Sequence, residues 1–140
     1  MNDFPVPDTL VIEREMPHAP EKVWRALTEG ALLSEWLMAN DFRPVVGHRF
    51  SFRAHPVGDW NGIIECEVIT VEPHTQLAYT WGTLGMGSKV IWTLTPSASG
   101  THLRMEQQGF KPDQKANYKG AQYGWNKFLG NMERVLGGLQ

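Results

Sequence analysis

Hydrophobic and polar residues alternate along the middle of the chain. In residues 47–54, Phe50 and Phe52 stand between polar neighbours, and residues 60–72 continue the alternation. A period of two puts successive side chains on opposite faces of a β-strand. Because turn residues separate most such segments, we expect an antiparallel sheet with one wet face. The same pattern predicts four further strands, over residues 9–16, 76–81, 89–95 and 101–108.

Three other segments have apolar positions at the three- and four-residue spacing of helices. Residues 18–28 carry Pro20 and Glu21, a pair that favours the first turn of a helix, and residues 31–38 form a second short segment. After Pro112 the helical spacing continues to the end of the chain. This last segment predicts an amphipathic helix of about five to six turns.

Three glycines, Gly120, Gly124 and Gly130, interrupt the predicted C-terminal helix. Each costs about 1 kcal/mol relative to alanine inside a helix. They indicate either weak points that tertiary contacts tolerate, or a place where the backbone approaches a neighbour or leaves space for a ligand.

The order of elements predicts an α+β fold. One strand, two short helices, a run of strands and one long helix follow each other, so the apolar face of the sheet must be covered by the terminal helix. We expect a curved antiparallel sheet of about six to seven strands wrapped around that helix. A strongly twisted sheet cannot close tightly at both ends, so a cavity is expected between sheet and helix. The 140 residues fit one domain, 1–140, with residues 1–8 as a flexible N-terminus.

Several stretches, in this order, resemble the START-like (helix-grip, SRPBCC) superfamily and, within it, the family named for the activator of heat-shock-protein-90 ATPase. The stretches are His18 to Thr28, Leu33 to Leu37, Glu67 to Pro73 with Leu77 to Trp81, Thr93 to Pro96 with Gly100 to Leu103, and Gly124-Trp125 with Leu129, Met132 and Leu136. The resemblance implies the helix-grip fold. It also implies a function among those that the fold hosts, which include lipid and polyketide binding, cyclase activity, stress response and co-chaperone action. A chaperone is one partner that it implies, although 140 residues leave no room for the separate domain with which the co-chaperone engages the chaperone.

Composition excludes several classes of partner. With 13 basic and 15 acidic residues the net charge is −2 and no basic run occurs, so we expect neither nucleic acid nor a membrane as partner. The chain contains one cysteine, Cys66, and residues 1–7 lack the basic and apolar stretches of a signal peptide. These features predict a cytoplasmic protein.

Candidate catalytic groups are few. None of the five histidines stands at a metal-site spacing, and no cofactor motif occurs; the glycine-rich segment 82–87 lacks the lysine and the following helix of a phosphate loop. Cys66 is predicted to be a buried small hydrophobe, and Glu65 and Glu67 are predicted to lie on the solvent face. We therefore predict no catalytic residue, no metal and no cofactor.

Large aromatic side chains, six tryptophans among them, provide the candidate site. We expect them to hold a small hydrophobic or aromatic molecule, with Trp36 and Trp60 at the mouth and Tyr79, Gln107 and indole N–H groups as polar contacts. Two alternatives stay open: a cyclase, dehydratase or hydrolase acting on a hydrophobic substrate, and a protein-interaction module. The predicted lining residues are Trp36, Phe52, Trp60, Ile64, Cys66, Val68, Tyr79, Trp81, Trp92, Met105, Gln107, Trp125, Phe128 and Met132.

Overall fold

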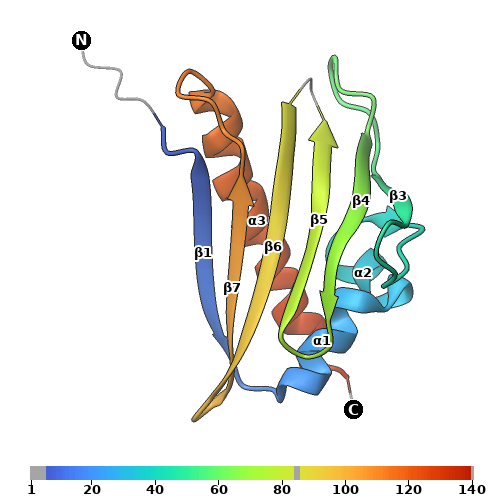
Figure 1. The fold of residues 1–140 in the computed structure, drawn as a ribbon, viewed down its shortest axis with the longest axis vertical. Helices are drawn as coiled ribbons and strands as arrows, with labels where there is room; N and C mark the ends of the chain where they lie inside the picture. Colours follow the sequence, from blue (N-terminus) through green and yellow to red (C-terminus); the bar gives the residue numbers. More distant parts are fainter. Residues whose placement is uncertain (1–5, 84–85, 140) are drawn as a thin grey trace.

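Seven antiparallel strands form one curved sheet in the order β1-β7-β6-β5-β4-β3-β2 (Figure 1). The computed structural model describes residues 6–83 and 86–139. Each strand except β2 is joined to its neighbours by several paired residues, so the sheet is continuous from β1 to β3. The strands are β1 (Thr9–Met16), β2 (Ala39–Asn40), β3 (Arg49–Arg53), β4 (Ile63–Glu72), β5 (Gln76–Thr83), β6 (Met86–Ser97) and β7 (Gly100–Gln108).

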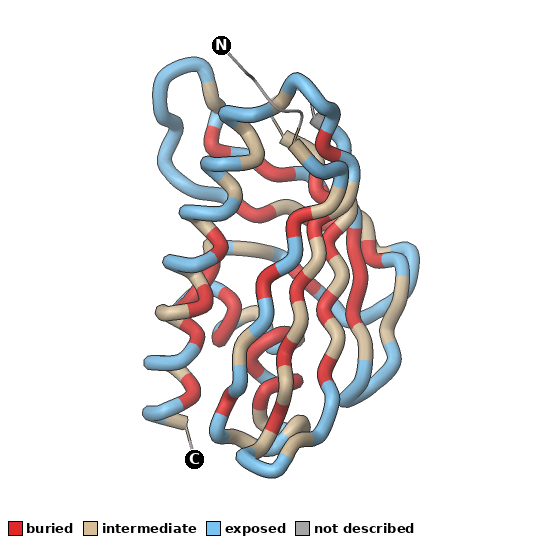
Figure 2. Tube along the Cα trace, turned by 90° about the vertical axis from the view of Figure 1, so that its left-hand side faces the viewer, coloured by how far each residue is buried: buried red, intermediate tan, exposed pale blue. Residues whose placement is uncertain are grey.

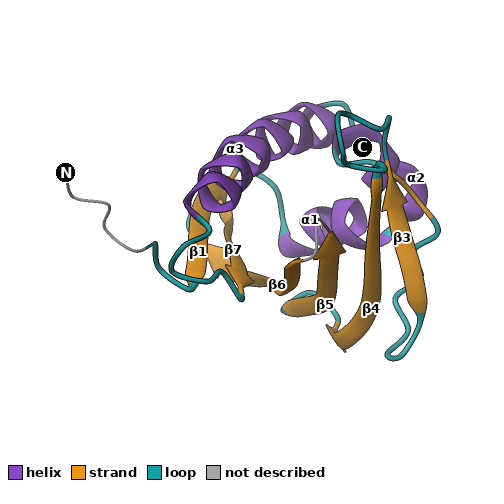
Figure 3. Cartoon of the chain, turned by 90° about the horizontal axis from the view of Figure 1, so that it is seen from above, coloured by secondary structure: helices purple, strands orange, loops and turns teal. Residues whose placement is uncertain are grey.

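Three helices accompany the sheet: α1 (Pro20–Thr28), α2 (Gly30–Trp36) and α3 (Lys115–Gly137). Seen from above, α3 arches across the concave side of the sheet (Figure 3). The two short helices contact α3 and lie beside its later part (Figure 1). This is the predicted arrangement of one long helix held by a curved sheet. Among the described residues, no helix is both long enough and apolar enough to cross a membrane.

The alternation of residues sorts side chains between the core and the solvent as predicted. In β4, Ile64, Cys66 and Val68 are buried, whereas Glu65 is exposed and Glu67 is partly exposed. The tube in Figure 2 shows the same alternation of buried and exposed positions along the other strands. Period-two patterning therefore defines the concave face that meets α3.

The predicted element boundaries differ from the structure at two turns. Residues 60–62 are not part of β4, because an isolated bridge between Val57 and Trp60 closes a tight turn there and Gly62 follows at φ +80°. A Cβ at Gly62 would lie 2.3 Å from the carbonyl oxygen of Ala54, so a glycine is required. Strands β5 and β6 extend into the predicted 82–87 connection, of which residues 84 and 85 lie outside the described part. The two-residue strand β2 was not predicted.

The start of the described chain is attached to the segment before α3. The Val6 N–H donates to the carbonyl oxygen of Pro112 at 3.3 Å, and the carbonyl oxygen of Asp8 accepts the N–H groups of Gly109 and Phe110. Residues 6–8 of the predicted flexible N-terminus thus make backbone contacts. Residues 1–5 lie outside the described residues.

Candidate ligand-binding site

Aromatic side chains fill the middle of the interior. Trp125 of α3 lies with its ring centre 5.0 Å from that of Trp81 and 5.6 Å from that of Trp92. Trp92, which is fully buried, meets Trp36 edge-on at 5.8 Å. These distances are those of well-packed aromatic pairs. The space between the sheet and the centre of α3 is therefore occupied by the protein itself.

Polar groups within this packed centre find partners inside the protein. The indole N–H of Trp36 donates to the Ala26 carbonyl oxygen, and that of Trp92 donates to the Tyr79 hydroxyl. Burial raises the pKa of Tyr79 far above its usual range and raises the pKa of the Cys66 thiol to about 12. Both groups are therefore protonated at neutral pH, and Cys66 behaves as the small buried hydrophobe that the sequence predicts.

A cavity of about 330 Å³ lies at the end of the molecule where α3 begins, beyond Trp81 and Trp125. It is partly open to solvent. Residues 116–128 of α3 form one wall, and the ends of strands β4 to β7 with the flanking segments form the other. The lining residues are Met38, Trp60, Ile64, Trp81, Thr83, Ser88, Gln107, Phe110, Ala116, Asn117, Gly120, Ala121, Gly124, Trp125 and Phe128.

Small residues on α3 explain why the cavity lies there. Gly120, Ala121 and Gly124 face it with no side chain larger than a methyl group. A Cβ at Gly120 would meet nothing within 4 Å, and one at Gly124 would meet only the Phe128 ring, at 3.9 Å. Gly130, on the same helix, also has open space around its Cβ position but does not line the cavity. Two of the three helix glycines thus match the ligand-space interpretation of the sequence.

Trp60 forms the edge of the cavity. It belongs to the loop between β3 and β4, is partly buried, and donates its indole N–H to the Thr83 hydroxyl at 2.7 Å. The Thr83 hydroxyl in turn donates to the carbonyl oxygen of Ile63 at 3.3 Å. This pair attaches the loop to the end of β5. Trp60, which the sequence analysis placed at the mouth of a ligand site, thus lines the cavity from the loop between β3 and β4.

A directed chain of hydrogen bonds runs along the cavity wall. Trp125 donates its indole N–H to Gln107 Oε1 at 2.8 Å, Gln107 Nε2 donates to Ser88 Oγ at 3.1 Å, and Ser88 donates to the Trp81 carbonyl oxygen at 2.8 Å. An indole N–H can only donate, so the atom of Gln107 that faces it must be oxygen. With the oxygen facing Trp125, Nε2 of Gln107 must face Ser88, so Gln107 donates to Ser88 and Ser88 donates to Trp81. Gln107 is 4% exposed and is the one buried amide among the described residues of this wall.

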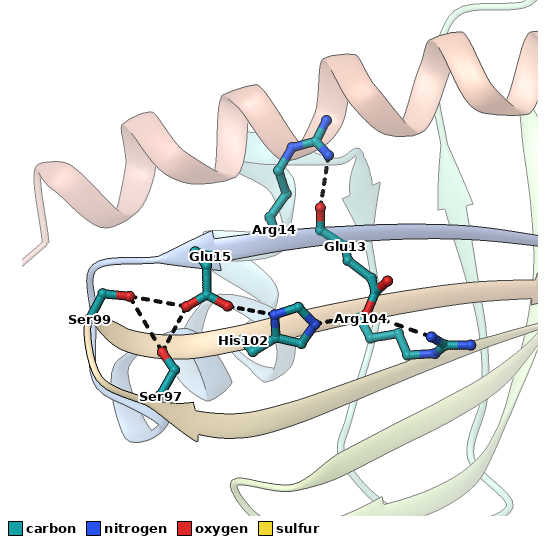
Figure 4. Close-up of polar contacts among 7 residues, drawn as sticks. All are labelled: Glu13, Arg14, Glu15, Ser97, Ser99, His102 and Arg104. Atoms are coloured by element: carbon teal, nitrogen blue, oxygen red, sulfur yellow. Dashed lines mark hydrogen bonds and ion pairs between the residues drawn. The ribbon is translucent and has the colours of Figure 1, made fainter.

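No charged side chain occurs among the described lining residues. Among the described residues, the histidine that is paired with carboxylates lies elsewhere, on the outer face of the sheet (Figure 4). There His102 Nε2 is 2.8 Å from Glu13 Oε1, and His102 Nδ1 contacts a carboxylate oxygen of Glu15. Hydrogen bonds to Glu13 and then to Glu15 raise the pKa of His102. The sequence alone did not show this cluster, because it depends on the register that sets Glu15 opposite His102 in β1 and β7.

The predicted lining residues divide into two groups. Six line the cavity: Trp60, Ile64, Trp81, Gln107, Trp125 and Phe128. Eight are buried in the core and do not line it: Trp36, Phe52, Cys66, Val68, Tyr79, Trp92, Met105 and Met132. The prediction that Trp36 stands at the mouth is wrong, because α2 turns it onto Trp92 and leaves it 1% exposed. Tyr79 likewise directs its hydroxyl to Trp92 and not into the cavity.

The remaining lining residues were not predicted. They are Met38, Thr83, Ser88, Phe110, Ala116, Asn117, Gly120, Ala121 and Gly124. Most are small or come from segment ends, where periodicity carries no signal. The helix glycines were the one indication in the sequence that α3 leaves room for another group.

Residues 17–137 match the model of a protein family described as activator of Hsp90 ATPase homolog 1-like protein. The chain belongs to this family. Its structure is similar to that of protein MLL2253 from Mesorhizobium loti, with 48% sequence identity and a TM-score of 0.86 over 94% of this chain and 98% of that one. The family and the helix-grip fold implied by the sequence resemblance are thus confirmed. No curated protein matches the chain.

Two similar structures come from other proteins of the same fold. DynU16, a protein of the dynemicin biosynthetic locus, is 25% identical with a TM-score of 0.80; the match covers 94% of this chain and 48% of DynU16, about half its length. CalU16 from Micromonospora echinospora is 19% identical with a TM-score of 0.75, over 91% of this chain and 75% of that one. The second likeness shows the fold alone.

Proposed function

We propose that this chain binds a small, largely apolar molecule in the cavity between residues 116–128 of α3 and the sheet. The observation that carries the proposal is the cavity of about 330 Å³, which the helix leaves open by presenting glycine and alanine. This volume lies at the lower end of the range of about 300–1,000 Å³ that small-molecule sites occupy. It is about twice the volume of an engineered apolar cavity that binds benzene, so a ligand of about two fused rings fits.

The energetics support a modest affinity. Burying roughly 200 Å² of apolar ligand surface contributes about 5 kcal/mol before the costs of association, at about 25 cal/mol per Å². Trp81, Trp125 and Phe128 offer aromatic surfaces to such a ligand. The likeness to DynU16, which comes from a biosynthetic locus, supports a role in handling a small molecule. We propose the cytoplasm as the compartment, where the Cys66 thiol stays reduced.

The catalytic alternative has less support. A reaction in the cavity would need an ionisable group with a shifted pKa at its wall. Among the described residues, the two groups whose pKa burial raises most, Cys66 and Tyr79, lie in the packed centre. Interaction with a chaperone stays a prediction from the family resemblance.

The test compares two leucine substitutions on the same helix. Gly124→Leu fills the cavity, whereas Gly130→Leu adds the same side chain at a helix position outside the cavity. Both remove a helix glycine, so both should raise the free energy of unfolding by about 0.5–1 kcal/mol. Thermal shift and NMR titration with flavonoids, polyketides, fatty acids and sterol-like compounds identify binders to wild type. Those binders should lose at least tenfold in affinity for Gly124→Leu and keep it for Gly130→Leu.

The outcome against the proposal is equally definite. If wild type responds to no compound at millimolar concentration, or if both leucine variants bind as wild type does, the cavity is not a binding site.

A further inference from the structure

We propose that the cavity selects an uncharged aromatic molecule carrying one hydroxyl or carbonyl oxygen, and that this oxygen binds the side-chain amide of Gln107. The inference rests on the proposed function, because it assigns the ligand class to the same cavity. Two independent features carry it: the absence of charge from the described wall and the spare hydrogen-bonding capacity of Gln107.

The described residues of the wall include no charged side chain that could compensate a charged ligand. The described members of the wall are apolar, aromatic, hydroxyl or amide side chains, with no Asp, Glu, Lys, Arg or His among them. A carboxylate or ammonium group that enters such a site loses its hydration without gaining an opposite charge. A ligand acid would have to be protonated first, far from its usual pKa near ~4. The interior of the cavity therefore disfavours a charged group and favours a neutral molecule.

Gln107 has donors and acceptors left over after its internal contacts. A glutamine amide has two N–H donors and an oxygen with two lone pairs. In the described residues, Trp125 takes one lone pair and Ser88 takes one N–H. The second N–H and the second lone pair have no protein partner there. A ligand hydroxyl can accept from the first and donate to the second, and a ligand carbonyl can accept from the first.

The internal contacts also hold Gln107 in place for this role. Trp125 and Ser88 form hydrogen bonds with the oxygen and the nitrogen of the amide, and the indole donor determines which atom is oxygen. The side chain is thus oriented before a ligand arrives, and binding does not need to order it. The hydroxyl of Thr83, which lies near the mouth, already accepts a hydrogen bond from Trp60 and donates one to Ile63. Ser88 is likewise engaged by Gln107 and Trp81, and Asn117 is less buried, so Gln107 is the buried amide through which we expect the wall to contact a ligand.

Three probes with the same ring system test separately the effect of a neutral hydroxyl and the effect of a negative charge on binding. Naphthalene has no polar group, 2-naphthol has one neutral hydroxyl because a phenol ionises only near pH ~10, and 2-naphthoate is an anion at pH 7. Their dissociation constants are measured by NMR titration of the full-length protein at pH 7. We expect 2-naphthol to bind about two- to tenfold more tightly than naphthalene, the value of one neutral hydrogen bond. We expect 2-naphthoate to bind at least about tenfold more weakly than 2-naphthol.

Two glutamines that are adjacent in β7 provide the matched variants. Gln107→Leu removes the inward amide and should abolish the preference for 2-naphthol over naphthalene. Gln108→Leu makes the same change at the neighbouring position, which does not line the cavity, and should keep that preference. If Gln107→Leu does not fold, the NMR spectrum of wild type still tests whether Gln107 contacts the ligand oxygen. The side-chain amide protons of Gln107 should move further downfield with 2-naphthol, which accepts a hydrogen bond from them, than with naphthalene, which shifts them only through its ring current.

The outcomes distinguish this inference from the function on which it rests. If naphthalene and 2-naphthol bind equally, or if 2-naphthoate binds best, the cavity binds ligands but the assigned ligand class is wrong. If none of the three probes binds although another compound binds wild type and not Gly124→Leu, this inference is wrong and the proposed function stands. If no compound binds at all, both are overturned.

Discussion

The two halves of the interior are built from the same sheet and the same helix but are packed differently. The packed half, around Trp36, Trp92 and Leu129, has α1 and α2 against the later part of α3 and leaves its large side chains almost fully buried. The open half, around Trp60 and Gly124, has a helix wall of small residues and a loop at its edge. The difference lies mainly in the inward-facing residues of α3, which are small beside the cavity (Gly120, Ala121, Gly124) and large in the packed half (Leu129, Met132, Leu136).

This contrast shows how one helix separates stability from binding. Packing the later part of α3 with leucine and methionine supplies the buried apolar surface that holds the fold together. Glycine in its earlier part lowers helix propensity but leaves the volume that a ligand needs. Trp125 stands at the boundary, because it contacts Trp92 of the packed half and also lines the cavity.

The largest expected effect on stability comes from replacing a tryptophan by alanine in the packed half, compared with the same replacement in the open half. Trp92→Ala removes a fully buried ring and its hydrogen bond to Tyr79, so it should lower the free energy of unfolding by about 3–5 kcal/mol. Trp60→Ala removes a partly buried ring and one hydrogen bond to Thr83, and should cost about 1–2 kcal/mol. Urea unfolding followed by circular dichroism measures both values. Equal losses for the two variants would contradict the division into a packed and an open half.

A smaller effect should come from pH at the outer face of the packed half. His102 lies between Glu13 and Glu15, with Ser97 and Ser99 also bonded to Glu15 and Arg104 near Glu13 (Figure 4). The pKa of His102 is raised above its ordinary 6.5 by its hydrogen bonds to the two carboxylates. Its contribution to stability is therefore complete below pH 6.5 and is lost as the pH rises through the raised value.

The stability contributed by the two carboxylates depends on pH in the opposite direction. The pKa of Glu13 is lowered from 4.5 mainly by its hydrogen bond to His102, and that of Glu15 by its hydrogen bonds to Ser97 and His102. Their contribution is complete above pH 4.5 and is lost as the pH falls through the lowered values. The difference in unfolding midpoint between wild type and His102→Gln should thus be greatest between about pH 4.5 and 6.5 and shrink at higher pH. High salt should reduce this difference, since the two carboxylates are exposed and His102 is partly exposed. A difference that grows above pH 8 would contradict the assignment.

Much of the fold follows from periodicity, because burial depends on which face a residue occupies. The alternation in β4 placed Cys66 inward and Glu65 outward, and both are found there. The turn at Gly62 was not predicted, since its need for a positive φ arises from the close approach of Ala54. Local pattern describes a residue's face but not its contacts with distant segments.

The candidate site was predictable only in part for the same reason. Strand alternation identified Gln107 as inward and helical spacing identified Trp125, and both are among the six that line the cavity. Alternation did not distinguish a residue beside empty space from one beside another ring, so Trp92 and Tyr79 were included although they fill the centre. The distinction depends on the size of the α3 residue opposite, and hence on the register of helix against sheet. The pairing of His102 with Glu15 depends on strand register in the same way.

The indole N–H signals of the tryptophans test the central claim most directly. In an NMR titration with 2-naphthol, the signals of Trp60 and Trp125 should move, because both rings line the cavity. The signals of Trp36 and Trp92 should stay in place, because their N–H groups are bonded to Ala26 and Tyr79 in the packed half. Movement of the second pair without the first, or no movement of any signal at saturating probe, would contradict a ligand site in the open half.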